Sequence, residues 1–329
     1  MDPRSTVQTA LLGLALASAL LAQAQGSGAR PASRPTTATP VADKIPEPLS
    51  GPPIVSAKAW AIADAKTGKL LFGYKQDVQL PMASTTKLMT AWLVLRLAKQ
   101  DPKVLDEEVT FSAFADSTGG SSTTIRAGER LPVRELLYGL LLPSGNDAAN
   151  ALAEHFGGRL QKPPKGMVWP HTTRPRPKPD VWFRFVAEMD RSARAMGMKD
   201  TQYWNPHGLD CKGHRTTAAD LLILARRFMQ SPLLRSYVAT RRHRATLAAA
   251  NGSTRQVTWR NTNRLLGIQG YGGIKTGTTS RAGACLVSSS TRKQDQLLMV
   301  VLGSSSSRGR YVDSRNLYRW AFREFGHQD

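Results

Sequence analysis

A serine and a lysine three residues apart, Ser84 and Lys87, open an apolar stretch of helical length that runs to Gln100. Residues three apart lie on one face of a helix, so the lysine amine would come within hydrogen-bond reach of the serine hydroxyl. A serine hydroxyl becomes a nucleophile when a base removes its proton, and lysine is a base only when uncharged. Burial in the apolar sequence LMTAWLVL, or a second positive charge nearby, would lower the lysine pKa accordingly. The pair therefore predicts a serine nucleophile with a lysine as its general base.

An isolated S-x-x-K match has little specificity, because a chain of this length is expected to contain about one by chance. Ser290 and Lys293 also match, but they lie in a polar turn between two predicted strands, where nothing would desolvate the lysine. The sequence context therefore selects Ser84 and Lys87.

A second group of residues could complete such a site. Ser144-Gly145-Asn146 lies on a tight turn between two predicted helices. Ser144 would relay a proton to a leaving group, and Asn146 would hold both Lys87 and a substrate amide. A helix-capping turn would use the same residue types, since Ser and Asn are favoured there. Another S-x-N match, at Ser314, lies inside the last amphipathic helix.

The tripeptide Lys-Thr-Gly occurs twice, and its surroundings differ. The first copy, at residues 66–68, joins two short alternating runs and predicts an exposed hairpin turn. The second copy, Lys275-Thr276-Gly277, precedes the apolar strand sequence AGACLVSSS. There Lys275 would face the serine and supply the second positive charge, and Thr276 would bind a substrate carboxylate. Gly277 lacks a side chain, so a peptide could lie along the strand.

The predicted secondary structure would bring these three groups together. Strands at both ends of the chain with helices between them predict one α+β domain whose terminal strands pair antiparallel in a single sheet. The predicted elements are a hairpin at 57–75, helices at 84–100, 133–156 (broken at Pro143), 181–198 and 217–230, strands at 282–289 and 296–303, and a helix at 314–325.

In their order along the chain, the three groups resemble the three motifs of serine penicillin-binding enzymes. The flanking sequences are similar to those of D-alanyl-D-alanine carboxypeptidases of low molecular mass, and the likeness runs from about Lys58 to Phe325. It is carried by PMASTTKLMTA, GGSSTTIRAGERLPVRELLYGLLLPSGNDAANALAEH, GMKDTQYWNPHGLD, NTNRLLG and GGIKTGTTSRAGACLVSSS. The resemblance implies a β-lactamase/transpeptidase-like α+β fold. In this fold a five-stranded antiparallel sheet lies between helices, an all-helical lobe lies beside it, and the serine sits at their interface.

The resemblance also implies a reaction. Ser84 would attack the carbonyl between the last two D-alanines of a peptidoglycan stem peptide, with Lys87 as general base and Ser144 as proton relay. Backbone N–H groups of Ser84 and Thr278 would form the oxyanion hole, and water would hydrolyse the acyl-enzyme. β-Lactam antibiotics would acylate the same serine, and no metal or cofactor is implied. The other implied site residues position Lys87, set the electrostatics or bind substrate: Asn146, Lys275, Thr276, Gly277, Thr278 and Arg310, the last by its place in SSSSRGRYVDS near Arg308.

The ends of the chain differ from the central part. Residues 1–24 predict a signal peptide, with an apolar stretch and the cleavage site Ala22-Gln23-Ala24. The apolar stretch is short for a bilayer core of about 30 Å, and an uncleaved anchor is the alternative. We therefore expect an exported protein, periplasmic or secreted. Because the sequence ends soon after Phe325, we expect no second domain and no C-terminal membrane anchor.

Composition separates three further regions. Residues 25–53 are rich in Pro, Ala and Thr and predict a disordered spacer. Residues 54–326 would form the catalytic domain, interrupted by a Pro-rich basic loop at 159–180. The net charge of +21 suggests contact between this loop and an acidic cell-surface polymer, although arginines spread over a solvated surface are the simpler explanation. We expect no nucleic-acid partner. Of two cysteines, Cys285 lies in an apolar run that predicts a buried free thiol, although export would permit its pairing with Cys211.

Other functions stay open at this stage. A D,D-endopeptidase that cuts peptidoglycan crosslinks would share every motif. A β-lactamase would need a further glutamate, and the sequence lacks E-x-x-L-N. A non-catalytic basic wall-binding protein would not need the three motifs. A zinc site could use His207, Asp210, Cys211 and His214, but their spacing matches no common zinc motif.

Overall fold

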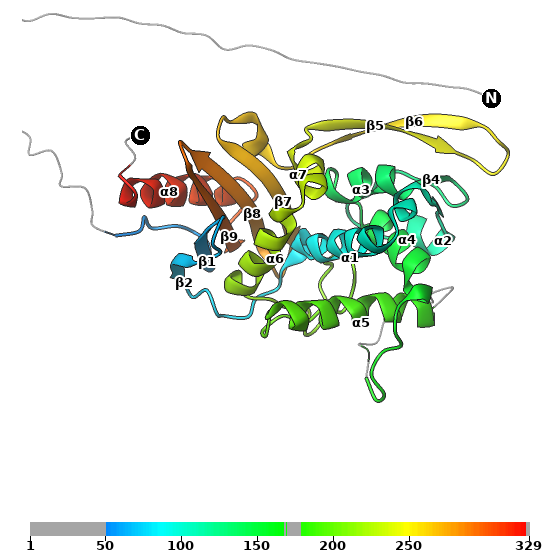
Figure 1. Ribbon diagram of the computed structural model, residues 1–329, viewed down its shortest axis with the longest axis horizontal. Coiled ribbons are helices and arrows are strands. Elements are labelled where there is room, and N and C mark those ends of the chain that lie inside the picture. The colour runs from blue at the N-terminus through cyan, green and yellow to red at the C-terminus, as the bar shows by residue number, and fades with distance from the viewer. Residues whose placement is uncertain (1–50, 168, 170–178, 327–329) are drawn as a thin grey trace, which may run out of the picture. The chain divides into compact units, whose positions relative to one another are not determined.

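The computed structural model describes residues 51–167, 169 and 179–326 (Figure 1). The predicted signal peptide, nearly all of the predicted spacer and residues 168 and 170–178 of the predicted basic loop lie outside the described residues. The described strands are β1 (Ala59–Asp64), β2 (Leu70–Tyr74), β3 (Glu108–Thr110), β4 (Arg130–Pro132), β5 (Arg242–Ala248), β6 (Thr254–Arg260), β7 (Tyr271–Thr279), β8 (Gly283–Arg292) and β9 (Asp295–Ser304).

The helices agree well with the periodicity of the sequence. The α-helices are α1 (Lys87–Gln100), α2 (Ala113–Asp116), α3 (Val133–Leu141), α4 (Asn146–Phe156), α5 (Pro179–Met196), α6 (Ala218–Gln230), α7 (Pro232–Ala239) and α8 (Gly309–Glu324). Short 3-10 turns are η1 (Ala83–Thr86), η2 (Pro102–Asp106), η3 (Gly157–Arg159) and η4 (Arg264–Gly267). No helix in these parts of the chain is long and apolar enough to cross a membrane.

One antiparallel sheet of five strands, in the order β2-β1-β9-β8-β7, is the centre of the fold. The prediction of a five-stranded antiparallel sheet built from both ends of the chain is confirmed, since β1 pairs with β9 from Ala59 opposite Leu302 onward. The first Lys-Thr-Gly copy forms the turn between β1 and β2, as predicted, and Gly68 has φ +80° there. The strand β7, which contains the second Lys-Thr-Gly copy, lies at one edge of this sheet.

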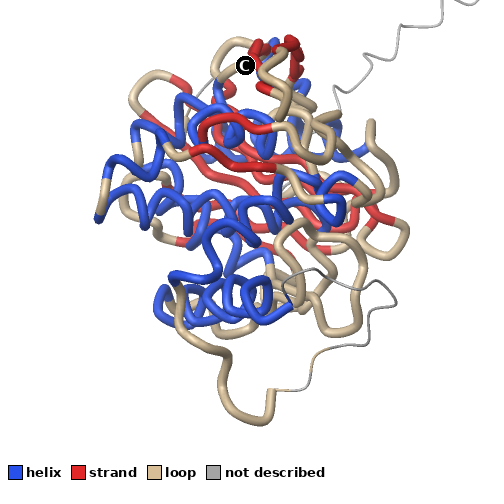
Figure 2. Tube along the Cα trace, turned by 90° about the vertical axis from the view of Figure 1, so that its right-hand side faces the viewer, coloured by secondary structure: helices blue, strands red, loops and turns tan. Residues whose placement is uncertain are grey.

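Both faces of the sheet are covered by helices, which explains why β1, β8 and β9 are buried along most of their length. Trp60 and Ile62 pack on one side with residues of α8, and Ala61 and Ala63 pack on the other with α1 and α6. Figure 1 shows α8 on one side of the sheet and α6 on the other, and Figure 2 shows the arrangement from the side of the helical lobe.

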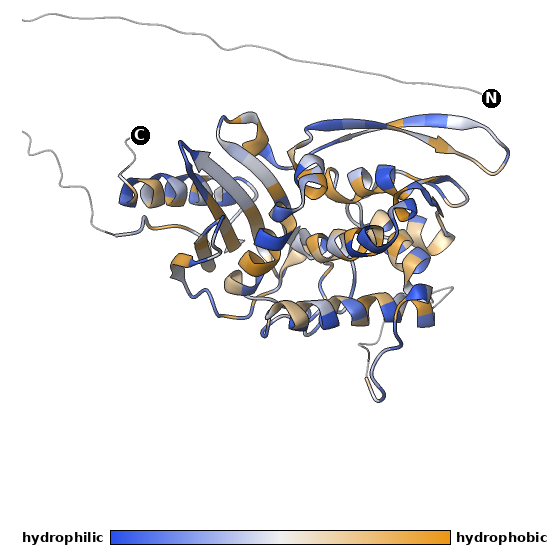
Figure 3. Ribbon diagram, in the orientation of Figure 1, coloured by the Kyte–Doolittle hydropathy of each residue, from blue (hydrophilic) through white to orange (hydrophobic). Residues whose placement is uncertain are grey.

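The lobe beside the sheet is mainly helical but not entirely so. A second sheet, in the order β3-β4-β5-β6, runs along it, and its long β5–β6 hairpin was not predicted from the sequence. The hairpin alternates as a half-buried strand pair should, with Ala245, Leu247, Val257 and Trp259 buried between more exposed neighbours. Figure 3 shows the hairpin mostly in the blue and pale colours of hydrophilic residues, with orange at a few apolar positions. Its outer positions carry arginines, which hid the strand pattern.

Candidate active site

The predicted nucleophile lies in the 3-10 turn η1, directly before the helix α1 that was predicted to contain it. Neither Ser84 nor Thr85 caps α1, whose N-cap residue is Thr86 and has no side-chain capping bond. The Thr85 and Thr86 hydroxyls instead donate to the carbonyls of Met82 and Ala83, each over 2.7 Å. The tight turn still places Ser84 over the first residue of α1. Lys87 Nζ lies 2.9 Å from Ser84 Oγ, as the three-residue spacing predicted.

Lys87 is fully buried and has three oxygen partners. Besides Ser84, Nζ lies 2.7 Å from Asn146 Oδ1 and 2.6 Å from the carbonyl oxygen of His207. The Asn146 amide is oriented because its Nδ2 donates to the Gly119 carbonyl over 2.8 Å, so Oδ1 faces the lysine. Both of these oxygens can only accept hydrogen bonds, whereas the serine hydroxyl can donate.

This set of partners fits an uncharged amine. A neutral Lys87 has two N–H donors and one lone pair, and the two acceptor-only oxygens take the donors. The lone pair is then left for the Ser84 hydroxyl proton. Burial, followed by the positive charge of Lys275, lowers the pKa of Lys87 well below its usual value, and the buried carboxylate of Asp147 acts in the opposite direction. The geometry and the pKa shift both support a base aimed at Ser84.

The second predicted group lies on the turn between α3 and α4. Ser144 has φ +70°, a left-handed conformation that is uncommon for residues other than glycine. In this conformation its hydroxyl oxygen accepts a hydrogen bond from Lys275 Nζ over 2.8 Å. Asn146 begins α4, and so one turn supplies a residue to each of the two lysines. The prediction of a tight turn here is confirmed.

The second Lys-Thr-Gly copy lies within β7, and the structure brings it to the same place. Lys275 is buried, and burial together with the charge of Arg310 lowers its pKa from 10.5 to about 7. Gly277 passes directly over the serine turn: a Cβ on this residue would lie 2.8 Å from the Ser84 backbone nitrogen. The strand can therefore approach the nucleophile this closely only with glycine at that position.

The predicted carboxylate-binding residues lie at the end of β7. Arg310 Nη1 donates to the Gly277 carbonyl over 2.8 Å and to Thr278 Oγ1 over 3.0 Å. Arg310 is buried, whereas Arg308 is exposed, so the structure brings Arg310 and not its neighbour to the site. Thr276 Oγ1 lies 2.8 Å from Thr262 Oγ1, a residue that the sequence analysis did not select.

The loop that contains the sequence HGLDCKGH contributes more than the sequence suggested. It supplies the His207 carbonyl to Lys87, and Asp210 accepts hydrogen bonds from Thr279 Oγ1 over 2.6 Å and from the Arg281 N–H over 3.2 Å. His214 Nδ1 accepts from the Trp204 N–H, so Nε2 donates to Thr86 Oγ1 over 2.8 Å. Burial lowers the pKa of His214 to about 3, which keeps it neutral in this role.

The four residues of the alternative zinc site therefore have other partners. Among the described residues, no three His, Cys, Asp or Glu side chains are grouped so that they could hold a metal ion. Cys285 is a buried thiol, as predicted, and it forms no disulfide with Cys211. The other motif copies lie away from the site: Lys293 is in the β8–β9 turn, and Ser314 is within α8.

The shifted pKa of Lys275 predicts a pH-dependent stability. Between about pH 7 and 10.5 the unfolded chain keeps this lysine protonated while the folded protein does not, so the free energy of unfolding should rise with pH. One proton contributes up to about 1.4 kcal/mol per pH unit. In Lys275→Met this dependence should be smaller by about that amount. Urea unfolding of both proteins between pH 7 and 9 measures it, and equal slopes would contradict an uncharged buried Lys275.

The α+β fold places the Ser84–Lys87 pair, at the start of a helix, close to the Ser144–Lys275 pair at the edge of the sheet. This arrangement defines the class of serine acyl-transfer sites that use a lysine base. The pattern of peptidase family S11, D-alanyl-D-alanine carboxypeptidase, matches residues 47–167 and 183–306, and the chain belongs to this family. The resemblance found in the sequence is thereby confirmed.

Individual relatives agree with this assignment. D-alanyl-D-alanine carboxypeptidase DacC of Escherichia coli is 31% identical over 281 residues, which are 83% of this chain and 63% of the relative. DacF of Bacillus subtilis is 29% identical over 271 residues, 82% of this chain and 63% of the relative. The chain thus spans slightly less than two thirds of the length of these relatives. The crystal structure of the Streptomyces K15 DD-transpeptidase superposes with a TM-score of 0.73 at 29% identity, over 83% of this chain and 99% of that one.

Proposed function

We propose that the protein is a serine-type D-alanyl-D-alanine carboxypeptidase that removes the terminal D-alanine from peptidoglycan stem pentapeptides through an acyl-enzyme on Ser84. One observation carries the proposal: Lys87 is buried, and of its three oxygen partners the Ser84 hydroxyl, 2.9 Å away, is the one able to donate a proton. The names of the relatives in the same family support the substrate.

Acylation would proceed in two steps. Lys87 takes the proton of Ser84 as Oγ attacks the carbonyl carbon between the two D-alanines, and a tetrahedral intermediate forms. Its negative oxygen is stabilised by the backbone N–H groups of Ser84 and Thr278, which the close passage of β7 over η1 supports. When the C–N bond breaks, Ser144 gives its hydroxyl proton to the D-alanine nitrogen, and the proton that Lys87 took from Ser84 restores the Ser144 hydroxyl, so Lys87 is neutral again. Lys275 Nζ holds Ser144 Oγ in place during this transfer.

Substrate orientation depends on the terminal carboxylate. Thr276 and Thr278 would donate hydroxyl hydrogen bonds to it, and Arg310, which holds Thr278 Oγ1, would supply positive charge. The space left by the missing side chain of Gly277 is filled by η1, so this glycine brings the strand close to Ser84. Water then attacks the ester carbonyl with Lys87 again as base, and this step releases the shortened stem peptide and restores Ser84.

The remaining parts of the chain fit the same proposal. Residues 54–326 would be the catalytic domain, exported through the signal peptide at residues 1–24 to the periplasm or the cell exterior. β-Lactam antibiotics would acylate Ser84, since they present a reactive amide with a nearby carboxylate to the same groups.

Covalent labelling tests the proposal directly. The mature protein should take up fluorescent penicillin at one site, and Ser84→Ala should take up none, because the substitution removes the hydroxyl that faces the base. Thermal unfolding of the variant checks that the fold is retained. Absence of label in the wild type, or equal label in the variant, would refute the assignment. Release of D-alanine from a pentapeptide, compared with cleavage of a crosslinked dimer, then separates a carboxypeptidase from an endopeptidase.

Arg310 offers a matched pair of variants. Arg310→Gln should raise KM for a pentapeptide by about tenfold or more, because a charge-assisted contact to the substrate carboxylate is lost. Arg308→Gln removes the same charge from an exposed position two residues away and should leave KM unchanged. Steady-state D-alanine release from both variants measures the difference. If the two variants behave alike, Arg310 has no role in binding the carboxylate.

A further inference from the structure

A second site lies at the base of the β5–β6 hairpin, outside the proposed active site. A pocket of about 510 Å³ is lined by Arg241, Arg242, Arg260 and Arg264, with Asn261 and Asn263 between them. All four arginines are exposed. Guanidinium groups bind phosphate and carboxylate through paired N–H donors, so a pocket with four of them has the chemistry of an anion site.

The sequence around this pocket lacks acidic residues. It contains no Asp or Glu between Leu221 and Gln294. Two carboxylates from elsewhere pair with residues of the inner face of the hairpin: Glu129 with Arg255 and Glu135 with His243. Within the described part of the chain, no ion pair includes any of the four pocket arginines.

The arrangement of the arginines is unfavourable without a ligand. Arg242 and Arg260 lie directly opposite each other in the β5–β6 register. Like charges in this position destabilise a strand pair, and a bound anion would remove the repulsion. Arg241 precedes β5 and Arg264 begins η4, so two further positive charges approach the same place from separate elements.

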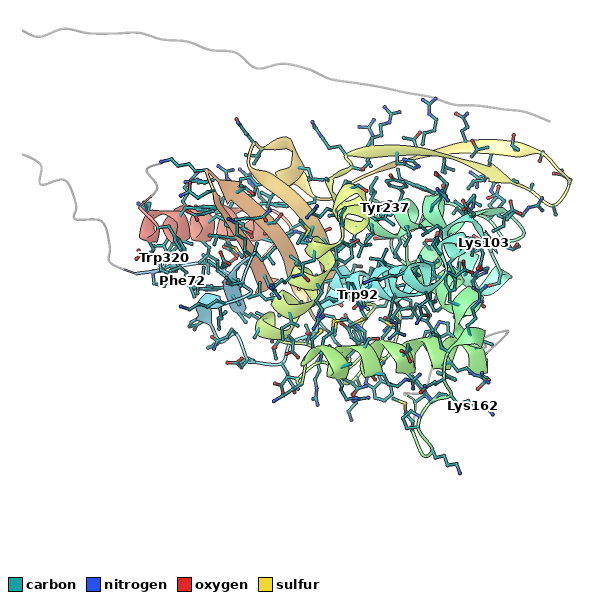
Figure 4. The ribbon with its side chains drawn as sticks, viewed as in Figure 1. Phe72, Trp92, Lys103, Lys162, Tyr237 and Trp320 are labelled. Atoms are coloured by element: carbon teal, nitrogen blue, oxygen red, sulfur yellow. The ribbon has the colours of Figure 1, made fainter. Side chains whose placement is uncertain are left out.

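The surface next to the pocket indicates what kind of anion would bind. The outer face of the hairpin continues with Arg244, Thr246, Gln256 and Thr258, all exposed and all polar. In Figure 4, nitrogen-tipped side chains extend outward along this face. None of the exposed large hydrophobic residues among the described ones belongs to β5 or β6. A membrane-binding surface would carry such residues for insertion, so a soluble, extended polyanion fits this face better.

We propose that the arginine pocket and the outer face of the β5–β6 hairpin bind a linear polymer with phosphate groups. Each phosphate within such a chain carries one negative charge and two terminal oxygens, so one group can accept hydrogen bonds from two guanidinium groups in the pocket. Neighbouring phosphates would continue along Arg244. The site is close to the substrate strand, since Thr262 lies between the two pocket asparagines and contacts Thr276 of β7. Polymer binding would therefore hold the enzyme to a phosphate-rich surface, with the substrate strand β7 close to that surface.

The proposal is tested with fluorescein-labelled polyphosphate and the full mature protein, by fluorescence anisotropy. The pocket variant combines Arg241→Gln with Arg264→Gln, and the matched control combines Lys162→Gln with Lys165→Gln, which removes the same charge from the basic loop. Lys162 lies on the side of the molecule opposite the hairpin (Figure 4). Thermal unfolding checks the fold of each variant, and Arg242→Gln with Arg260→Gln is a second pocket variant should the first be unstable.

The pocket variant should bind polyphosphate at least about tenfold more weakly, because two charge-assisted contacts are lost, and the loop control should change less than about twofold. Equal weakening in both would show diffuse charge attraction and overturn the proposal, as would no binding to the wild type. Two competitors test the partner: inorganic phosphate at equal phosphate concentration, and phosphatidylglycerol vesicles. Either one competing as well as unlabelled polyphosphate would contradict a polymer site. The readout is independent of the proposed reaction, so either proposal can fail alone.

Discussion

Replacing Lys87 by arginine should slow the acylation of Ser84 by penicillin by about 1,000-fold, although the positive charge is kept. A guanidinium cannot lose its proton near neutral pH, so it cannot accept the one from the serine hydroxyl. The two acceptor-only partners, Asn146 Oδ1 and the His207 carbonyl, would still be satisfied by N–H donors. The loss would therefore report the missing lone pair and not a collapsed hydrogen-bond network.

The measurement is the second-order rate constant of labelling with fluorescent penicillin, followed over time. Lys293→Arg is the matched control, because Lys293 is the lysine of the other S-x-x-K match and lies in the β8–β9 turn. Its rate should equal that of the wild type. A Lys87→Arg rate above about a tenth of the wild-type rate would show that another group is the base.

The pH dependence gives a second readout of the same residue. The wild-type rate should fall as the pH is lowered, because Lys87 gains a proton and loses its lone pair. Burial and Lys275 lower the pKa of Lys87, so this fall should occur well below the ordinary lysine range. The fall in rate at low pH should be missing in Lys87→Arg, because the arginine side chain does not lose or gain a proton in this range.

The sequence was sufficient to predict those parts of the site that depend on local spacing. A serine and a lysine three residues apart face the same way in any helical turn, so the Ser84–Lys87 contact follows although the turn is 3-10 and not α-helical. The pairing of strands from both ends of the chain in one sheet could be predicted from the strand patterns at those ends, whereas the number of five strands came from the family resemblance. Arg310 was selected over Arg308 by resemblance alone, and the structure supports the choice by burial.

Parts of the site that depend on backbone groups or distant side chains could not be predicted. The His207 carbonyl meets Lys87 across 120 positions of the chain, and every residue type has a carbonyl. Nothing in the sequence around Thr262 indicates a role, because its contact with Thr276 forms only when β7 folds beside it. The β5–β6 hairpin was missed because its outer positions are polar, with arginine at 242, 244 and 260, and resemble an irregular basic segment. The alternation of buried and exposed residues along β5 and β6 also places the arginines together on one exposed face. The pocket forms where β5, β6 and η4 meet, which the sequence alone does not show.

Gly208 is the residue with the largest predicted effect among those that the sequence analysis did not select. Its φ is +94°, and a Cβ built on it would lie 1.9 Å from the Ala83 carbonyl oxygen and 2.9 Å from the Ser84 backbone nitrogen. Gly208 is therefore where the loop that holds Lys87 touches the turn that holds the nucleophile. Both contacting atoms belong to the backbone, so no side chain can rotate away to make room.

Gly208→Ala should lower both stability and reactivity. The left-handed φ costs about 1–2 kcal/mol for alanine, and the backbone clash adds about 1–3 kcal/mol. Relief of the clash must move η1 or the His207 carbonyl, and a shift of about 1 Å in a reacting group can slow a reaction about 100-fold. Urea unfolding measures the stability loss, and the penicillin labelling rate of the folded variant measures the displacement of Ser84.

Gly197→Ala separates the two causes, because Gly197 has nearly the same φ, +90°, and a Cβ added to it would have no neighbouring atom within 4 Å among the described residues. It should lose only the conformational part, about 1–2 kcal/mol, and keep the wild-type labelling rate. If Gly208→Ala behaves like Gly197→Ala in both measurements, the contact with η1 does not constrain the nucleophile. If it labels about 100-fold more slowly while remaining folded, the position of Ser84 depends on a loop that reaches it from a distant part of the chain.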